Sequence, residues 1–170
     1  TLQGDRVDRA LSAMGDFADL LSPSMGGHAR AVAGLAGGAA TLVGLTEPEA
    51  LHVRRGAMVQ DIGRISVEAR GWETSGELTA AEWEKVRLHP YFTQRVCASS
   101  PFLRRLGVDA ACHHERLDGS GYHRGVGAEL LPIAAQIPAA APAAEPGPVQ
   151  LAKFSSGATF VFERRRPLRT

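Results

Sequence analysis

Closely spaced prolines near the C-terminus set the strongest limit on what this chain can fold into. They are Pro138, Pro142, Pro146 and Pro148. Each proline costs about 3 kcal/mol inside a helix, because it lacks an N–H and its ring clashes with the preceding turn. A helix that begins near Leu131 is therefore expected to end at residue 137. The segment 138–170, rich in Pro, Ala and Arg, predicts an irregular tail, in which 149–162 is also compatible with a strand or hairpin.

Before these prolines the sequence predicts helices. Apolar residues recur at steps of three and four within 7–21 and 32–43, which places them on one helix face. Two capping boxes, at 46–49 and 79–82, predict the starts of further helices.

A bend and a loop are expected inside this helical region. Pro90 predicts a bend at His89. The periodicity fades between Gly63 and Gly76, which suggests a surface loop. Because no strand pattern occurs before residue 149, the predicted fold class is an all-α helical bundle with an irregular proline-rich tail.

Composition excludes several classes of protein. The chain has 170 residues, 44% of them apolar, which is enough for the core of one domain. Its net charge of +1 gives no strong field to attract nucleic acid or anionic lipid. Cys97 and Cys112 lack the CxxC spacing of zinc or redox motifs, and no apolar run approaches the about 20 residues of a membrane span. We expect a cytoplasmic protein that binds neither nucleic acid nor membrane.

Three segments are expected. Residues 1–24 are interpreted as a helix that links to an upstream domain, 25–137 as the functional domain and 138–170 as the tail. The first residue, Thr1, is compatible with a piece of a longer protein. The shift in composition at Pro138 is also compatible with out-of-frame reading of a GC-rich gene, which would truncate the last helices of the domain.

Residue types that bind metals are concentrated in the central part of the chain. They are His28, Asp61, His89, His113 and His114, with Arg64, Glu115, Arg116 and Asp118 nearby. Imidazole and carboxylate are ligands that hold Fe, Mn or Zn. A single histidine is more often structural, but His113 and His114 form a pair that runs directly into a glycine-rich loop. Adjacent side chains point about 100° apart on a helix, so both rings can face one site only if the metal lies between them, which favours a dinuclear centre.

The order and spacing of these residues resemble the HD-GYP group of the HD metal-dependent phosphohydrolases. The resemblance rests on His113-His114-Glu115-Arg116-Leu117-Asp118-Gly119-Ser120-Gly121-Tyr122, Gln60-Asp61-Ile62-Gly63-Arg64, Leu78-Thr79 followed by Glu82-Trp83, His89-Pro90, and His28 at the start of its helix. These motifs occur in family order, cover about residues 28–137, and include a ten-residue match that is highly specific. The family is an all-helical bundle around two or three metals that hydrolyses cyclic di-GMP to linear pGpG or onward to GMP.

The resemblance implies which residues hold metal. Asp61 would bridge two metals, and His89, His113 and His114 would complete one of them. The other metal would take His28, the bridging aspartate, a histidine and a late aspartate on the last core helix.

Two ligands of that other metal are replaced. Gln60 stands where the family has the histidine, and Pro142 where it has the late aspartate. A neutral amide is a poor ligand for Fe or Zn, and proline offers no side-chain donor. We therefore expect a degenerate member of the family, with one intact metal site and a second site that is weak or absent.

The resemblance also implies roles around the metals. Arg64 stands in place of a lysine that meets the phosphate, and arginine is suited to that task. Glu115 and Asp118 are expected to orient the histidines. The family's loop consists here of Gly119, Gly121 and Tyr122. In the family this loop is linked to contacts with diguanylate-cyclase domains, which are therefore candidate partners.

Two functions from different classes follow. The first is a metal-dependent phosphodiesterase that acts on a cyclic dinucleotide such as cyclic di-GMP, with activity impaired by the two replaced ligands. The second is a catalytically inactive module of bacterial signalling that senses nucleotides or binds a protein. Nucleotide binding without turnover separates the second function from the first.

Overall fold

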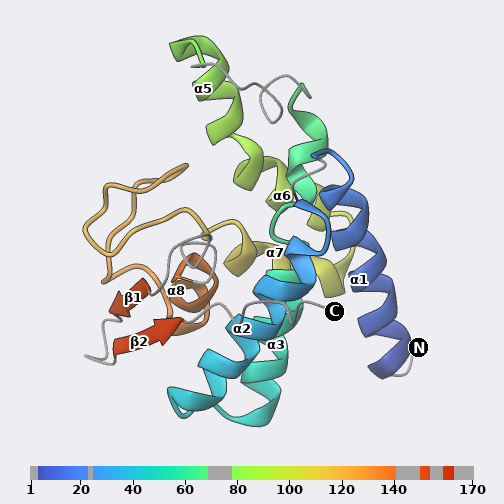
Figure 1. Cartoon of the computed structure of the whole chain (residues 1–170), viewed down its shortest axis with the longest axis vertical. Helices are drawn as coiled ribbons and strands as arrows, with labels where there is room; N and C mark the ends of the chain where they lie inside the picture. The colour runs from blue at the N-terminus through green and yellow to red at the C-terminus, as the bar shows by residue number, and fades with distance from the viewer. Residues whose placement is uncertain (1–3, 23–24, 69–77, 141–149, 154–158, 163–170) are drawn as a thin grey trace, which may run out of the picture.

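A computed structural model describes residues 4–22, 25–68, 78–140, 150–153 and 159–162. Its elements, in chain order, are α1 (Gly4–Asp19), α2 (His28–Leu42), α3 (Glu47–Val59), the 3-10 helix η2 (Ile62–Ser66), α5 (Ala80–Arg87), α6 (His89–Cys97), α7 (Pro101–Ala110), α8 (Ile133–Ala140), β1 (Gln150–Lys153) and β2 (Thr159–Phe162). The helices assemble into a bundle (Figure 1), which confirms the predicted all-α class. Within these ranges, no helix combines the length and the apolarity needed to cross a membrane.

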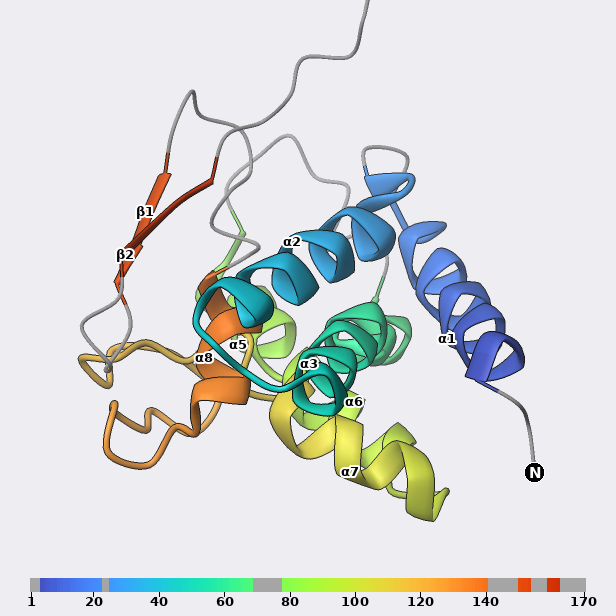
Figure 2. The same cartoon turned by 90° about the horizontal axis from the view of Figure 1, so that it is seen from below.

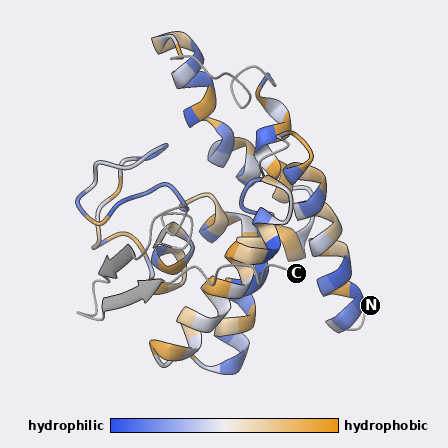
Figure 3. Ribbon diagram, in the orientation of Figure 1, coloured by the Kyte–Doolittle hydropathy of each residue, from blue (hydrophilic) through white to orange (hydrophobic). Residues whose placement is uncertain are grey.

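Small apolar residues let α2 and α3 pack closely at the centre of the bundle. Their buried cluster consists of Val32, Ala33, Ala36, Ala39, Ala40, Ala50, Val53, Ala57 and Ile137. Ile137 comes from α8, which lies beside α2 and α3 (Figure 2). Polar and apolar residues alternate around the helices (Figure 3), as expected where one face of each helix is buried.

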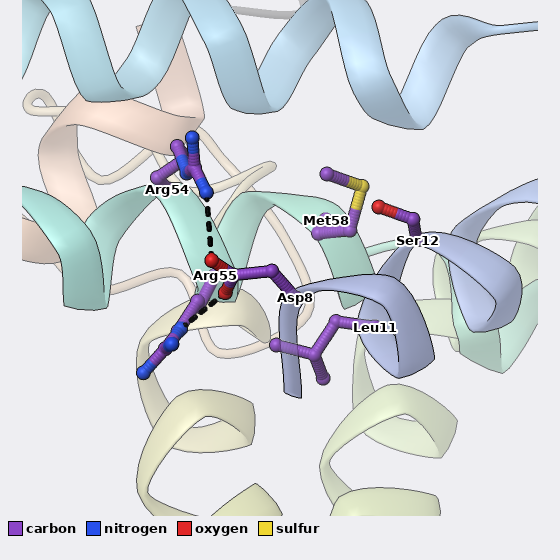
Figure 4. A pocket seen from close by; sticks show the side chains of 6 residues that line it. All are labelled: Asp8, Leu11, Ser12, Arg54, Arg55 and Met58. Atoms are coloured by element: carbon purple, nitrogen blue, oxygen red, sulfur yellow. Dashed lines mark hydrogen bonds and ion pairs between the residues drawn. The ribbon is translucent and has the colours of Figure 1, made fainter. Parts of the chain in front are cut away.

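The first helix packs against the elements that carry the predicted site. A second buried cluster consists of Leu11, Ala18, Val59, Ile62, Cys97 and Leu106. At the surface, the carboxylate of Asp8 accepts hydrogen bonds from Arg54 at 3.0 Å and from Arg55 at 2.7 Å (Figure 4). α1 therefore packs on α3 through both apolar and ionic contacts. Its interpretation as a link to an upstream domain stays a prediction.

Both capping boxes form as predicted. The backbone N–H of Thr46 donates to Glu49 at 2.8 Å, and that of Thr79 donates to Glu82 at 2.9 Å. These bonds satisfy backbone groups that a helix leaves unpaired at its start.

The bend predicted at His89 is confirmed. α5 ends at Arg87, and α6 begins at His89 with Pro90 in its first turn. Proline is tolerated there because the first turn of a helix does not need its N–H.

The expectation that the helix after Leu131 ends at residue 137 is wrong. α8 continues to Ala140 with Pro138 inside it, and Pro138 is fully buried. In so short a helix the missing N–H removes a single hydrogen bond, and burial of the ring offsets part of that loss.

Part of the tail forms a hairpin. β1 and β2 pair antiparallel, with Gln150 opposite Phe162 and Lys153 opposite Thr159. This agrees with the strand or hairpin alternative for 149–162. The rest of the tail, including Pro142, lies outside the described residues.

Candidate metal centre

The predicted metal ligands line one cavity of about 230 Å³. Its lining residues are Met25, His28, Gln60, Asp61, Arg64, Trp83, Val86, His89, His113, His114 and Tyr122. They come from the start of α2, the junction of α3 and η2, α5, α6 and the segment after α7. The fold thus brings together side chains that are far apart in the sequence.

Asp61 lies where rings from three segments converge. Its Oδ2 is 3.3 Å from Nε2 of His28, and its Oδ1 is 3.4 Å from Nε2 of His89 and 3.6 Å from Nε2 of His113. All four side chains are buried. Burial would raise the pKa of Asp61, but the close imidazoles of His113, His28 and His89 outweigh it and hold that pKa well below its usual range. The side chain is therefore an anion.

Backbone carbonyls orient two of the rings. Nδ1 of His89 donates to the carbonyl of Val86 at 2.7 Å, and Nδ1 of His113 donates to that of Ala110 at 2.7 Å. A neutral ring that donates through Nδ1 has its lone pair on Nε2. These Nε2 atoms lie 3.0 Å apart, and two facing lone pairs repel unless a cation lies between them. The donor set therefore fits a metal ion.

His114 completes a group that can hold a metal. The ligand atoms of His89, His113 and His114 all lie within 4.8 Å of one another. Burial, the largest cause, lowers the pKa of His114 to about 2 and also lowers the pKa of His89. Both rings are therefore neutral near pH 7, which is the state in which imidazole binds metals.

The part of the candidate centre near His28 offers fewer strong metal ligands than the part formed by the other histidines. Gln60 is fully buried, and its amide nitrogen lies 3.4 Å from Oδ2 of Asp61. Its Oε1 has no hydrogen-bond partner in the described structure. A neutral amide oxygen is the remaining donor at this position, and Pro142 lies outside the described residues.

Arg64 lies inside the site. The prediction of a surface loop that begins at Gly63 is wrong for its first residues. The 3-10 helix η2 forms there instead and buries Ile62, Gly63 and Arg64. Arg64 is only 6% exposed and lines the cavity, so a positive charge is held beside the histidines.

Thr93, which belongs to none of the sequence motifs, joins η2 to α6. Its hydroxyl donates to the carbonyl of Gln60 at 2.6 Å and accepts from the N–H of Gly63 at 3.0 Å. A Cβ at Gly63 would collide with the carbonyl of His89 and the nitrogen of Thr93. Thr93 lies four residues after His89, on the same face of α6, and that spacing is the signal that could have revealed it.

Glu115 binds backbone rather than the rings it was expected to orient. Its carboxylate accepts from the N–H of Arg124 at 2.7 Å and from that of Val126 at 3.1 Å. The carboxylate of Asp118 accepts from the N–H of Ser120 at 2.9 Å. Glu115 therefore shapes the loop, and Asp118 closes a local turn.

The loop places Tyr122 against the candidate metal ligands. Gly119 has a φ of +74°, and a Cβ at Gly121 would lie 2.5 Å from the carbonyl oxygen of His114. This close approach lets the N–H of Tyr122 donate to that carbonyl at 3.1 Å. The ring of Tyr122 stacks on that of His114, with centroids 4.5 Å apart.

The helical bundle and its buried cluster of histidine and aspartate agree with the fold and site that the resemblance to the HD family implies. The HD domain family matches residues 13–143. A 3'3'-cGAMP-specific phosphodiesterase 3 of Vibrio cholerae serotype O1 is 33% identical over 127 residues, which is 75% of this chain and 28% of that protein. A cyclic di-GMP phosphodiesterase of Thermotoga maritima is 34% identical over 116 residues, 67% of this chain and 32% of that protein.

A third relative is the cyclic di-GMP phosphodiesterase response regulator RpfG of Xanthomonas campestris pv. campestris, which is 33% identical over 109 residues, 63% of this chain and 29% of that protein. The chain belongs to the HD domain family, and within it to the HD-GYP group. It spans about a third of the length of these curated relatives.

Proposed function

We propose that this chain hydrolyses a phosphodiester bond of a cyclic dinucleotide, such as cyclic di-GMP or 3'3'-cGAMP. The observation that carries the proposal is the approach of two Nε2 atoms, those of His89 and His113, to 3.0 Å beside the Asp61 carboxylate. The names of the relatives support the substrate class. Asp61, His89, His113 and His114 would hold one divalent transition metal, Fe, Mn or Zn.

The chemistry divides between the metal and the protein. A bound metal would lower the pKa of a water ligand and polarise the phosphate. Arg64 would bind the phosphate oxygens, because guanidinium pairs bidentately with phosphate. In the reaction, the oxygen of water bonds to phosphorus and one P–O bond to a ribose oxygen breaks. A proton of the water ends on that ribose oxygen, which leaves as a hydroxyl, and the ring opens to a linear dinucleotide. The carbonyls of Val86 and Ala110 keep the two rings in the tautomer that this site requires.

We further propose that the activity is impaired. The His28 half offers His28, Asp61 and the amide of Gln60, so a second metal would be bound weakly. Loss of that metal removes part of the activation of water and of the clamp on the leaving oxygen. The buried amide of Gln60 also favours the second candidate function, a domain that binds cyclic dinucleotides without turnover.

Metal analysis and a hydrolysis assay of the purified chain test these proposals. We expect about one tightly held transition metal per chain, lost in His113→Ala, with slow conversion of cyclic di-GMP to a linear product. His52→Ala is the matched control, because His52 pairs with Asp109 at 2.9 Å and is absent from the cavity lining. Two tightly held metals per chain would contradict the one-metal centre. Binding without any turnover would select the second candidate.

Two further expectations stay predictions. Contact of the loop with diguanylate-cyclase domains depends on Gly119, Gly121 and Tyr122, and a pull-down with such a domain would test it. A cytoplasmic location requires localisation of the whole protein in cells.

A further inference from the structure

One large side chain in the cavity has no part in holding a metal. Trp83 of α5 lines the same cavity as the histidines, yet it is 46% exposed. Its ring lies 6.3 Å from that of Tyr122, centroid to centroid, in a T-shaped arrangement. The exposed part of the indole is thus accessible to a ligand that enters the cavity.

Tyr122 connects Trp83 with the metal ligands. It stacks on His114 with planes inclined by 18°, and the guanidinium of Arg87 lies 5.4 Å from its centroid. Arg87 follows Trp83 by one helical turn. The ring of Tyr122 therefore lies between the half-exposed indole of Trp83 and the ring of His114 in the histidine cluster.

We propose that Trp83 is the platform on which a purine base of the substrate stacks while the adjoining phosphate lies at the histidine cluster. The inference rests on the proposed function, which makes the ligand a cyclic dinucleotide. Such a ligand combines an anionic phosphate with a flat base. Arg64 supplies the charge opposite to the phosphate, and the exposed indole is a suitable stacking partner for the base. Stacking tolerates either purine, so Trp83 accepts guanine and adenine alike.

Equilibrium binding of cyclic di-GMP to metal-loaded protein tests this role. We expect Trp83→Leu to raise Kd about tenfold, as for loss of one base stack, and Trp83→Phe to raise it about twofold. Phe102→Leu on α7 is the matched control, because Phe102 is 43% exposed and is absent from the cavity lining. The other tryptophan of the chain is Trp72, so a Trp72→Phe background isolates the fluorescence of Trp83, which the bound purine is expected to quench.

The outcomes separate this inference from the proposed function. Equal Kd values for wild type, W83L and W83F, without quenching, would overturn the stacking role and leave the function standing. A wild-type chain that binds no cyclic dinucleotide would overturn both. If W83L weakens binding of inorganic phosphate by the same factor as binding of the dinucleotide, Trp83 shapes the cavity and the stacking role is wrong.

Discussion

The hydroxyl of Thr93 donates to the backbone carbonyl of Gln60 at 2.6 Å, and this bond ties α6 to the residue that precedes Asp61. Because α6 begins with His89, the same bond helps to fix the spacing between Asp61 and His89, two proposed metal ligands that come from different elements. Both partners are buried, so neither can exchange this bond for water.

Replacing Thr93 by valine is expected to destabilise the chain. Valine matches the shape of threonine but leaves the carbonyl of Gln60 and the N–H of Gly63 without a partner, at a cost of about 1–3 kcal/mol. Urea unfolding of metal-free protein measures the change, and metal titration is expected to show weaker binding. Thr93→Ser keeps the hydroxyl and serves as the control. A valine variant as stable as wild type would contradict the role given to this hydroxyl.

Adding one methyl group at Gly63 is expected to cost about 2 kcal/mol or more. A Cβ there meets the backbone of His89 and Thr93, which cannot rotate away as a flexible side chain can. Gly38 of α2 is the matched control, because a Cβ at that position meets nothing within 4 Å. Gly38→Ala is expected to stabilise by about 0.5–1 kcal/mol. Thermal unfolding of both variants checks the contrast, which equal melting temperatures would refute.

The metal-free chain is expected to lose stability as the pH falls below about 6.5. The pKa of His114 is lowered, mainly by burial, to about 2 in the folded state, whereas an unfolded histidine titrates near about 6.5. Between these values the unfolded state binds the extra proton, so the free energy of unfolding falls by up to about 1.4 kcal/mol per pH unit for this ring. Burial of His89 acts in the same direction.

Denaturant unfolding of chelator-treated protein between pH 7 and pH 4 measures this slope. His114→Asn is expected to reduce this slope by the contribution of about one proton, because the variant has no ring to protonate at this position. An identical slope in wild type and variant would show that the buried ring does not carry the effect.

Restoring a histidine at position 60 is expected to strengthen the second half of the centre. Gln60→His supplies an imidazole near His28 and Asp61, so the metal content is expected to rise from about one toward two per chain, with faster hydrolysis. Gln60→Leu removes the amide without adding a ligand and is the control. If Gln60→His gains neither metal nor rate, the amide at this position is not what weakens the site.

Local signals predicted the parts of the fold that depend on near neighbours. The capping boxes at Thr46 and Thr79 formed as expected because their partners lie three residues away. The break before His89 followed from Pro90 for the same reason. The predicted end of α8 was wrong, because burial of Pro138 against the bundle outweighs the local cost of a proline inside a helix.

The sequence by itself determined the helices, their starts and the set of residues able to bind a metal, since these follow from periodicity, backbone chemistry and side-chain type. Only the tertiary structure decided that Thr93 joins η2 to α6, that Glu115 binds the loop backbone, and that Trp83 lines the same cavity as the histidines. Each of these depends on packing between segments distant in the chain. Such packing is set by which surfaces meet in three dimensions. A local pattern such as the four-residue spacing of His89 and Thr93 indicates a shared helix face, but not the segment that this face contacts.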